Sequence, residues 1–110
     1  MERFVAGDVV VVVFPHSNLK SYKRRPALIL SQGDFNDIIV CQITSQQDDS
    51  LNTVRLDKSS FASGDLPVTS YARPDKLITL DQQLIVRRAG KLTNKSIEII
   101  KRRLADIFEI

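Results

Sequence analysis

Apolar residues in the first part of the chain form short unbroken runs, and glycine, proline and polar residues separate these runs. In Asp8–Phe14, five valines and a phenylalanine follow one another, and β-branched side chains at successive positions favour a strand buried on both faces. Similar runs predict strands at Pro26–Gln32 and Asp37–Thr44, joined by a turn at Gly33–Asn36. Between the first two strands, Pro15–Arg24 is expected to be a long polar loop.

The middle of the chain alternates polar stretches with shorter apolar segments. Ser45–Asn52 and the Ser/Gly-rich stretch Lys58–Pro67 are expected to be loops. Many short strands with Gly, Ser and Pro turns indicate a mainly β protein, with a small barrel rather than a sheet of βαβ units. The predicted short strands are Thr53–Leu56, Val68–Ala72, Lys76–Leu80 and Leu84–Arg88.

The hydrophobic period changes at the carboxyl end of the chain. From Thr93 onward, the apolar residues recur at helical spacing, and Thr93 is the expected N-cap. The sequence therefore predicts an amphipathic C-terminal α-helix. Its apolar face consists of Ile97, Ile100, Leu104, Ile107 and Phe108.

Length and composition predict a single domain over residues 1–110, because 43% of the 110 residues are hydrophobic. The longest apolar run, Val9–Phe14, is too short to span a membrane, and the amino end lacks the apolar segment of a signal peptide. The single cysteine, Cys41, excludes an internal disulfide and is interpreted as a core residue, and the one histidine cannot build a cluster of metal ligands. We therefore expect a cytoplasmic protein without membrane association, metal or cofactor.

The chain carries 16 Lys and Arg residues against 13 Asp and Glu residues, a net charge of +3. Because this excess is small, its distribution matters more than its size. The basic residues gather at 20–25, 87–91 and 101–103, and an uneven surface of this kind suits an anionic partner such as nucleic acid. For the last cluster, a solvated helix face is the alternative interpretation.

No glycine-rich phosphate loop, GxSxG motif or HExxH motif occurs in the sequence. The side chains left for catalysis are Arg, Thr, Ser, Asp and the single His, and this set suits phosphate chemistry. An arginine guanidinium holds a phosphate through two parallel hydrogen bonds and stabilises negative charge that develops on its oxygens. RNA supplies its own nucleophile, the 2′-OH, so a protein with these groups alone can cleave it.

Three motifs follow one another along the first half of the chain: GDVVVVVFP at Gly7–Pro15, RRPALILS at Arg24–Ser31 and IVCQITSQ at Ile39–Gln46. Together they resemble the MazF/PemK (Kid) family of toxin endoribonucleases. In that family a strand that begins with Gly-Asp, a loop that closes on Arg-Pro and a strand that ends in Ile-Thr-Ser-Gln occur in this order. The resemblance covers essentially the whole chain, because the predicted C-terminal helix also stands where the family has its own.

This resemblance implies a small SH3-like (PemK-like) barrel that forms a homodimer and is the toxin of a type II toxin–antitoxin system. It implies sequence-specific, metal-independent cleavage of single-stranded mRNA by 2′-OH attack, which leaves 2′,3′-cyclic phosphate and 5′-OH ends. It also implies a cognate antitoxin, whose acidic disordered tail covers the basic groove, and DNA binding by that complex. Two alternatives stay open: a non-catalytic RNA- or protein-binding module on the same barrel, and a gyrase-directed toxin of the same architecture.

The resemblance assigns catalytic roles to Arg25 and Thr44. Arg25 precedes a proline that cannot donate a backbone hydrogen bond, and it would stabilise the transition-state charge and protonate the leaving group. Thr44 ends the third predicted strand and would position the scissile phosphate, with Ser45 as the neighbouring substitute. The alternatives are an arginine that only pairs with Asp34 or Asp37 and a threonine that only caps its strand.

Further candidates match the family less closely. Arg73 and Asp75 correspond to an Arg-x-Asp of some members, where Asp75 could act as general base with Arg73 on a phosphate; a local salt bridge at a turn is the alternative. His16 offers an imidazole that titrates near neutral pH. Its distance from the Arg-Pro dipeptide differs from that of the loop histidine in some relatives, so an ordinary loop residue is the other interpretation.

The loop before the Arg-Pro dipeptide also supplies candidate RNA-binding residues, namely Lys20, Tyr22, Lys23 and Arg24. Tyr22 can stack on a base while Lys20 and Lys23 hold the RNA backbone, and a solvent-facing tyrosine is the alternative. The loop lacks the glycine and the glutamine that are frequent in the family. That departure leaves open the RNA sequence that is cut, more than the chemistry of the cut.

Overall fold

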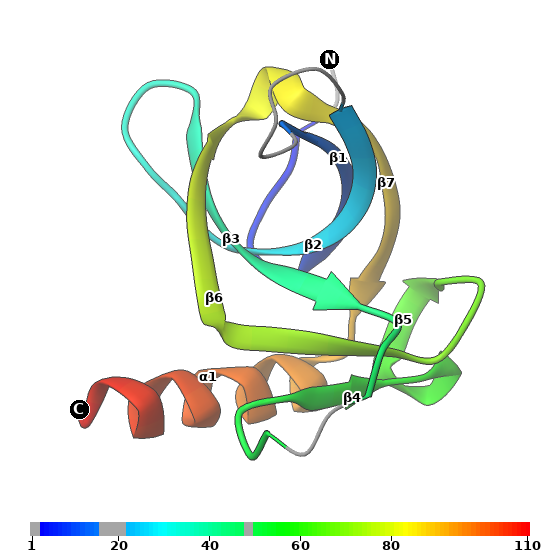
Figure 1. The fold of residues 1–110 in the computed structure, drawn as a ribbon, viewed down its shortest axis with the longest axis vertical. Coiled ribbons are helices and arrows are strands. Elements are labelled where there is room, and N and C mark those ends of the chain that lie inside the picture. Colours follow the sequence, from blue (N-terminus) through cyan, green and yellow to red (C-terminus); the bar gives the residue numbers. More distant parts are fainter. Residues whose placement is uncertain (1–2, 16–21, 48–49) are drawn as a thin grey trace.

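The computed structural model describes residues 3–15, 22–47 and 50–110. Within them, seven strands form one curled sheet in the order β4-β6-β3-β2-β1-β7-β5, and helix α1 lies against this nearly closed barrel (Figure 1). The predicted mainly β barrel with a C-terminal α-helix is therefore confirmed. In chain order the elements are β1 (Asp8–Pro15), β2 (Tyr22–Gln32), β3 (Asp37–Thr44), β4 (Val54–Leu56), the 3-10 helix η1 (Lys58–Ser60), β5 (Phe61–Gly64), β6 (Ser70–Asp81), the 3-10 helix η2 (Gln82–Leu84), β7 (Ile85–Leu92) and α1 (Asn94–Phe108).

Strands β1 and β2 are buried on both faces, as their apolar runs predict. Val9 and Leu28 belong to a core cluster that also includes residues of α1, whereas Val10, Val12 and Ile29 belong to a second cluster. Each of these side chains is at most 2% exposed. Because successive side chains of a strand point to opposite faces, one strand with two apolar faces can serve two cores.

Helix α1 has the N-terminal boundary that the sequence predicts and buries most of the predicted apolar face, but Phe108 is 54% exposed and does not join the core. The Thr93 hydroxyl accepts a hydrogen bond from the backbone N–H of Ser96 at 3.1 Å and so caps the helix. Ile100 is 1% exposed, and Ile97 and Leu104 pack on the same core cluster. In the part of the chain that the structure describes, no helix is long and apolar enough to cross a membrane.

Strand β6 corrects the prediction of two short strands, because it runs unbroken from the first of them to the second (Figure 1). Its pairing with β3 is irregular: Arg73 pairs with Gln42, but Leu77 pairs with the adjacent Cys41. The residues between Arg73 and Leu77 therefore bulge out of the ladder. Pro74 lies in this bulge, where its missing N–H breaks no ladder hydrogen bond, and so the strand tolerates an internal proline.

The Ser/Gly-rich stretch expected to be a loop contains η1 and β5 instead. Asp57 caps η1, because its carboxylate accepts the backbone N–H of Ser59 at 2.9 Å. Strand β5 pairs with β7, and Gly64 lies opposite Gly90. A Cβ atom on Gly64 would lie 2.2 Å from the Ala89 carbonyl oxygen, so the close approach of these two strands requires glycine there.

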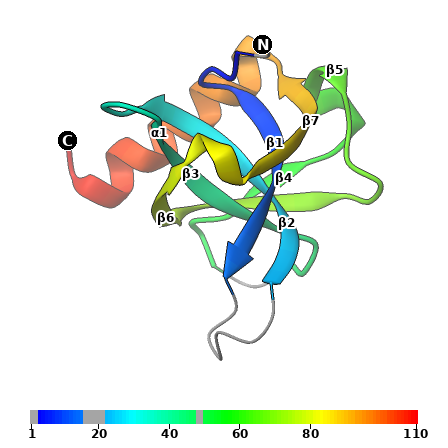
Figure 2. The ribbon, with the colours of Figure 1, turned by 90° about the horizontal axis from the view of Figure 1, so that it is seen from above.

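The hairpin of β1 and β2 projects beyond the barrel (Figure 2). Strand β2 begins at Tyr22, earlier than expected, so Lys23 and Arg24 lie in a strand and not in a loop. Lys23 pairs with Phe14, and Arg25 pairs with Val12. Regular pairing with β1 thus fixes the backbone of these basic residues.

Candidate active site

The register of β2, β3 and β6 brings the two predicted catalytic residues to the same end of the barrel. Ala27 pairs with Gln42, and continuing this register by two residues places Arg25 opposite Thr44. On the other side of β3, Gln42 pairs with Arg73. Three predicted site residues, far apart in sequence, therefore lie on three adjacent strands.

Two adjoining cavities open at this end, with volumes of about 570 and 210 Å³. Both are lined by Arg25, Ile43, Thr44 and Gln46, so the predicted catalytic side chains lie where the cavities meet. We call the two cavities together the groove. The larger cavity is also lined by Lys23, Arg24, Pro26, Ser45, Leu66, Pro67, Val68 and Ser70, and the smaller one by Gln42, Gln47, Arg73 and Lys76.

Arg25 is exposed to solvent at the groove. Among the described residues, no carboxylate oxygen lies within 4.0 Å of its guanidinium nitrogens. The suggested partner Asp37 pairs with Asp81 at the far end of β3, and Asp34 lies in the turn that precedes it. Antiparallel pairing thus separates both acids from Arg25, and the guanidinium keeps its donors for a ligand.

Thr44 is half-buried at the end of β3, and its hydroxyl has a defined role in the local backbone. The Gln46 backbone N–H donates a hydrogen bond to Thr44 Oγ1 at 3.1 Å. A hydroxyl that accepts in this way still has its own hydrogen to donate. Since the structure gives that hydrogen no acceptor in the described chain, it can be donated to an oxygen of a ligand in the groove.

Arg73 and Asp75 form a salt bridge at the β6 bulge. Arg73 Nη2 lies 3.1 Å from Asp75 Oδ2, and Arg73 Nε lies 3.2 Å from Asp75 Oδ1, with the two side chains 14% and 25% exposed. The hydrogen bonds from Arg73 hold the pKa of Asp75 below its ordinary value of 3.8. The carboxylate is therefore a weak proton acceptor, and it orients the guanidinium beside the smaller cavity.

The other predicted site residues divide into two groups. Lys23, Arg24 and Ser45 are exposed and line the larger cavity with Arg25. Tyr22 begins β2, but the structure describes its backbone only. His16 and Lys20 lie outside the described residues.

Sequence reasoning missed the amide groups of the groove. Gln42, Gln46 and Gln47 surround Thr44 in the sequence and line the smaller cavity. The Tyr71 hydroxyl donates to Gln47 Oε1 at 3.3 Å, so the amide N–H₂ of Gln47 points away from this bond. Amides carry both donors and acceptors and suit the edges of bases. The only signal in the sequence was the spacing of these glutamines around the Ile-Thr-Ser-Gln motif.

Lys76 and the segment Leu66–Val68 also line the groove without having been predicted. Cys41 is fully buried, and burial raises the pKa of its thiol to about 12, in agreement with its interpretation as a core residue. Among the residues that the structure describes, no three His, Cys, Asp or Glu side chains come together in a way that could hold a metal ion.

Comparisons with solved structures find the same fold in other proteins. Three structures are similar to the chain: an endoribonuclease in complex with its cognate antitoxin from mycobacterial species (TM-score 0.77, 20% identity, 98% of this chain and 97% of that chain covered), MazE-MazF (Form-III) from Deinococcus radiodurans (TM-score 0.78, 20% identity, 96% and 96%), and the Mycobacterium tuberculosis toxin MazF-mt6 (TM-score 0.75, 18% identity, 94% and 97%). At these identities the similarity establishes the fold.

A comparison with curated protein sequences finds no match. A family model, however, matches residues 6–108, nearly the whole chain, including every strand and the C-terminal helix. The model is described as the PemK-like, MazF-like toxin of type II toxin-antitoxin systems. The predicted family is thereby confirmed: this chain belongs to the PemK-like, MazF-like toxins of type II toxin–antitoxin systems.

Proposed function

We propose that this toxin is an endoribonuclease that cleaves single-stranded RNA in the groove without a metal ion. The observation that carries the proposal is the meeting of Arg25 and Thr44 at the junction of the two cavities, where both side chains carry hydrogen-bond donors that no described residue accepts. Arg73, Lys76 and the exposed basic residues of β2 add positive charge around this point. Such a concentration of donors and charge suits a phosphodiester.

In the proposed reaction the scissile phosphate lies against Arg25 and Thr44. The 2′-oxygen of the RNA forms a bond to phosphorus while the bond from phosphorus to O5′ breaks, which leaves a 2′,3′-cyclic phosphate and a 5′-OH. Arg25 donates to the non-bridging oxygens, whose negative charge grows in the transition state, and Thr44 donates one neutral hydrogen bond. Because arginine stays charged in proteins, Arg25 acts by stabilising charge and by donating a hydrogen bond to O5′, and solvent water supplies the proton that O5′ gains.

Arg73 extends the site along β6. Its guanidinium is held by Asp75, and we assign it to a phosphate adjacent to the one that is cut. Asp75 is then a positioning residue, since its lowered pKa makes it a poor general base. The proton of the 2′-OH therefore passes to solvent water and not to Asp75.

The partners follow from the charge of the groove. Solved relatives include complexes with an antitoxin, and we propose that an acidic segment of a cognate antitoxin covers the same cationic residues in this toxin. We further propose a homodimer that acts in the cytoplasm and binds DNA only together with its antitoxin. Mixing the toxin with RNA before and after adding the antitoxin would measure competition for the groove.

The test of the proposed activity is cleavage of a long RNA by the purified protein in EDTA. Discrete cuts with cyclic phosphate ends are the expected result, lost in Arg25→Ala, about tenfold slower in Thr44→Ala and unchanged in Arg102→Ala and Thr79→Ala. The two controls remove an exposed arginine and an exposed threonine outside the groove. RNA binding without cleavage by folded wild-type protein would favour a binding module, and inhibition of DNA gyrase without RNA cleavage would favour a gyrase-directed toxin.

A further inference from the structure

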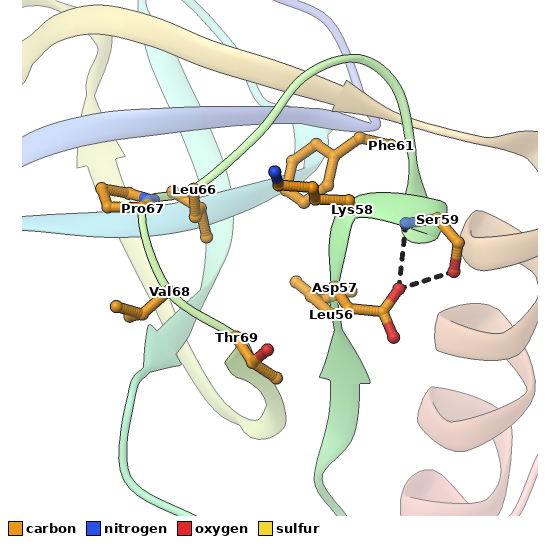
Figure 3. A pocket seen from close by; sticks show the side chains of 9 residues that line it. All are labelled: Leu56, Asp57, Lys58, Ser59, Phe61, Leu66, Pro67, Val68 and Thr69. Carbon is orange, nitrogen blue, oxygen red and sulfur yellow. Dashed lines mark hydrogen bonds between the residues drawn. The ribbon is translucent and has the colours of Figure 1, made fainter.

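A further cavity, of about 440 Å³, opens between η1 and the segment that precedes β6 (Figure 3). Phe61 and Lys58 lie on one side of it, and Leu66, Pro67 and Val68 lie on the other. Its volume falls in the range of about 300–1,000 Å³ that is usual for small-molecule sites. Neither the sequence motifs nor the roles proposed above use any residue of η1 or β5.

This cavity adjoins the groove. Leu66, Pro67 and Val68 line both this cavity and the larger cavity of the groove. The same short segment thus separates the two spaces, and Val68 is 59% exposed on it. A single strand of RNA that has its scissile phosphate at Arg25 has this space available where it leaves the groove.

The walls of the cavity combine an aromatic surface with a cation. Phe61 is half-buried against the core cluster, and a Cβ atom on the neighbouring Gly90 would lie 2.8 Å from its ring, so the ring is closely packed. Lys58 is exposed, and no carboxylate oxygen of the described residues lies within 4.0 Å of its ammonium group. Sites for single-stranded nucleic acid pair aromatic side chains that stack on bases with cations that hold the phosphates.

The one acid in the wall is engaged elsewhere. The Asp57 carboxylate accepts hydrogen bonds from the backbone N–H and the hydroxyl of Ser59 (Figure 3), and it lies 3.9 Å from Arg55 Nε. These hydrogen bonds hold its pKa below the ordinary value of 3.8. The Asp57 carboxylate is therefore held against the η1 turn by Ser59. Among the described residues of the cavity wall, Lys58 is the charged group that can contact an anion.

We propose that this cavity is a second nucleotide subsite, in which the apolar walls and Phe61 receive an unstacked base of the bound RNA and Lys58 contacts its phosphate. The subsite rests on the proposed function, because its ligand is a nucleotide of the same strand that is cut in the groove. The subsite and the proposed phosphate-binding groove share a wall, so one RNA strand can occupy both. This favours RNA over an acidic peptide as the ligand. The subsite would contribute to the choice of the RNA sequence that the toxin cuts.

The test uses RNA oligonucleotides that carry a 2′-deoxynucleotide at the cut position and so bind without being cleaved. One series is extended by single nucleotides on either side of the cut, and a second replaces each base in turn by an abasic unit. Affinities are measured for wild-type protein, Lys58→Gln, Phe61→Leu and the control Lys95→Gln, which changes an exposed lysine of α1. Thermal unfolding of each variant is recorded, because Phe61 packs on the core.

We expect Phe61→Leu and Lys58→Gln each to weaken binding of the extended RNA by about tenfold, while binding of the shortest RNA and all binding by Lys95→Gln stay unchanged. An abasic unit at one position should remove the effect of Phe61→Leu. Equal losses for short and extended RNA, or no loss in Lys58→Gln, would overturn the subsite. So would variants that weaken binding to the antitoxin alone.

Failure of the proposed function gives a different result. If the all-ribose RNA binds with the pattern above but is never cut by wild-type protein, the endoribonuclease activity is wrong and the subsite stands. If wild-type protein cuts RNA but the two variants bind every oligonucleotide as wild type does, the subsite is wrong and the activity stands. A wild-type protein that binds none of the oligonucleotides would overturn both.

Discussion

Two arginines on the strands that flank β1 have opposite environments. Arg88 on β7 lies with its Nε 3.2 Å from Asp8 Oδ2, donates from Nη2 to the Arg3 carbonyl oxygen at 2.6 Å, and has its guanidinium 5.0 Å from the centre of the Phe4 ring. Arg25 on β2 is exposed, and within the described residues it has neither a carboxylate nor a carbonyl partner. The Arg88 guanidinium therefore holds parts of the fold together, whereas the Arg25 guanidinium can bind a ligand in the groove.

The difference lies in where the acids are. Asp8 is 2% exposed, accepts the backbone N–H of Val5 at 2.9 Å, and also lies 3.5 Å from Lys91 Nζ. A buried carboxylate without partners would be costly, so Arg88 and Lys91 are structural cations. None of the described residues that line the groove is acidic, and Asp75 beside it binds Arg73. With a net charge of only +3, the position of each acid decides which basic residues face a ligand.

The largest expected effect comes from removing Arg25, which has no acidic partner among the described residues. Arg25→Ala should lower kcat/KM for RNA cleavage by about 100–1,000-fold, the usual effect of losing one group that stabilises transition-state charge. Arg25→Lys should recover little, because lysine cannot form two parallel hydrogen bonds to a phosphate. Since Arg25 is exposed, the urea midpoint of unfolding should not change. A large loss of stability would mean that Arg25 belongs with Arg88 as a structural cation.

The next largest effect comes from removing Asp8, and it concerns stability instead of activity. Asp8→Ala should lower the free energy of unfolding by about 3 kcal/mol, because Arg88 and Lys91 lose their shared acid and the Val5 N–H loses its acceptor. Urea denaturation measures this change, with Asp34→Asn, an exposed acid in a turn, as the control. Cleavage per folded molecule should stay at the wild-type level. Loss of cleavage in fully folded Asp8→Ala would contradict the division between the two regions.

The elements of the fold that depend on local sequence could be predicted. The valine run predicted β1, the apolar run that ends at Cys41 predicted β3, and Thr93 with the apolar spacing after it predicted α1, because each pattern is contained in one element. Arg25 and Thr44 were found through short motifs whose strands then proved to be neighbours. Their chemical roles stay predictions, since the fold places side chains but does not measure a reaction.

Other features depend on pairings between distant residues, which one sequence does not display. The ion pairs of Asp8 join the first strand to the last one, and the continuity of β6 through Pro74 depends on the bulge that β3 permits. A proline between two short apolar segments ordinarily indicates that one strand ends and another begins. Here the strand continues, and only its hydrogen-bond ladder is interrupted. Similarly, Phe61 on β5 and the Leu66–Val68 segment form cavity walls only because β7 and β6 bring them together.

A smaller effect comes from removing the hydroxyl of Thr44. Thr44→Val keeps the shape of the side chain but removes the hydroxyl, and should lower kcat/KM by about tenfold, the value of one neutral hydrogen bond to the substrate. Thr44→Ser should stay within about threefold of wild type, because its hydroxyl can still accept the Gln46 N–H and donate to a phosphate. Single-turnover cleavage measures both. Equal losses in the two variants would assign Thr44 to the shape of the strand end instead.

The smallest expected effect concerns the Arg73–Asp75 salt bridge. It pairs a cation with an acid, as Asp8 does, but it lies beside the groove. Asp75 has a lowered pKa, so its ionised form stabilises the folded state, and Asp75→Asn should cost about 0.5–1 kcal/mol at neutral pH. Above the ordinary value of 3.8, Asp75 is ionised in both folded and unfolded chains, and the difference between wild type and variant is complete. As the pH falls below 3.8 the unfolded chain takes up the proton first, and the difference shrinks and vanishes once the folded pKa is passed. Urea denaturation of both proteins from pH 7 down to acid measures this, and a difference that grows on acidification would show that Asp75 is held protonated, as a general base of raised pKa would be.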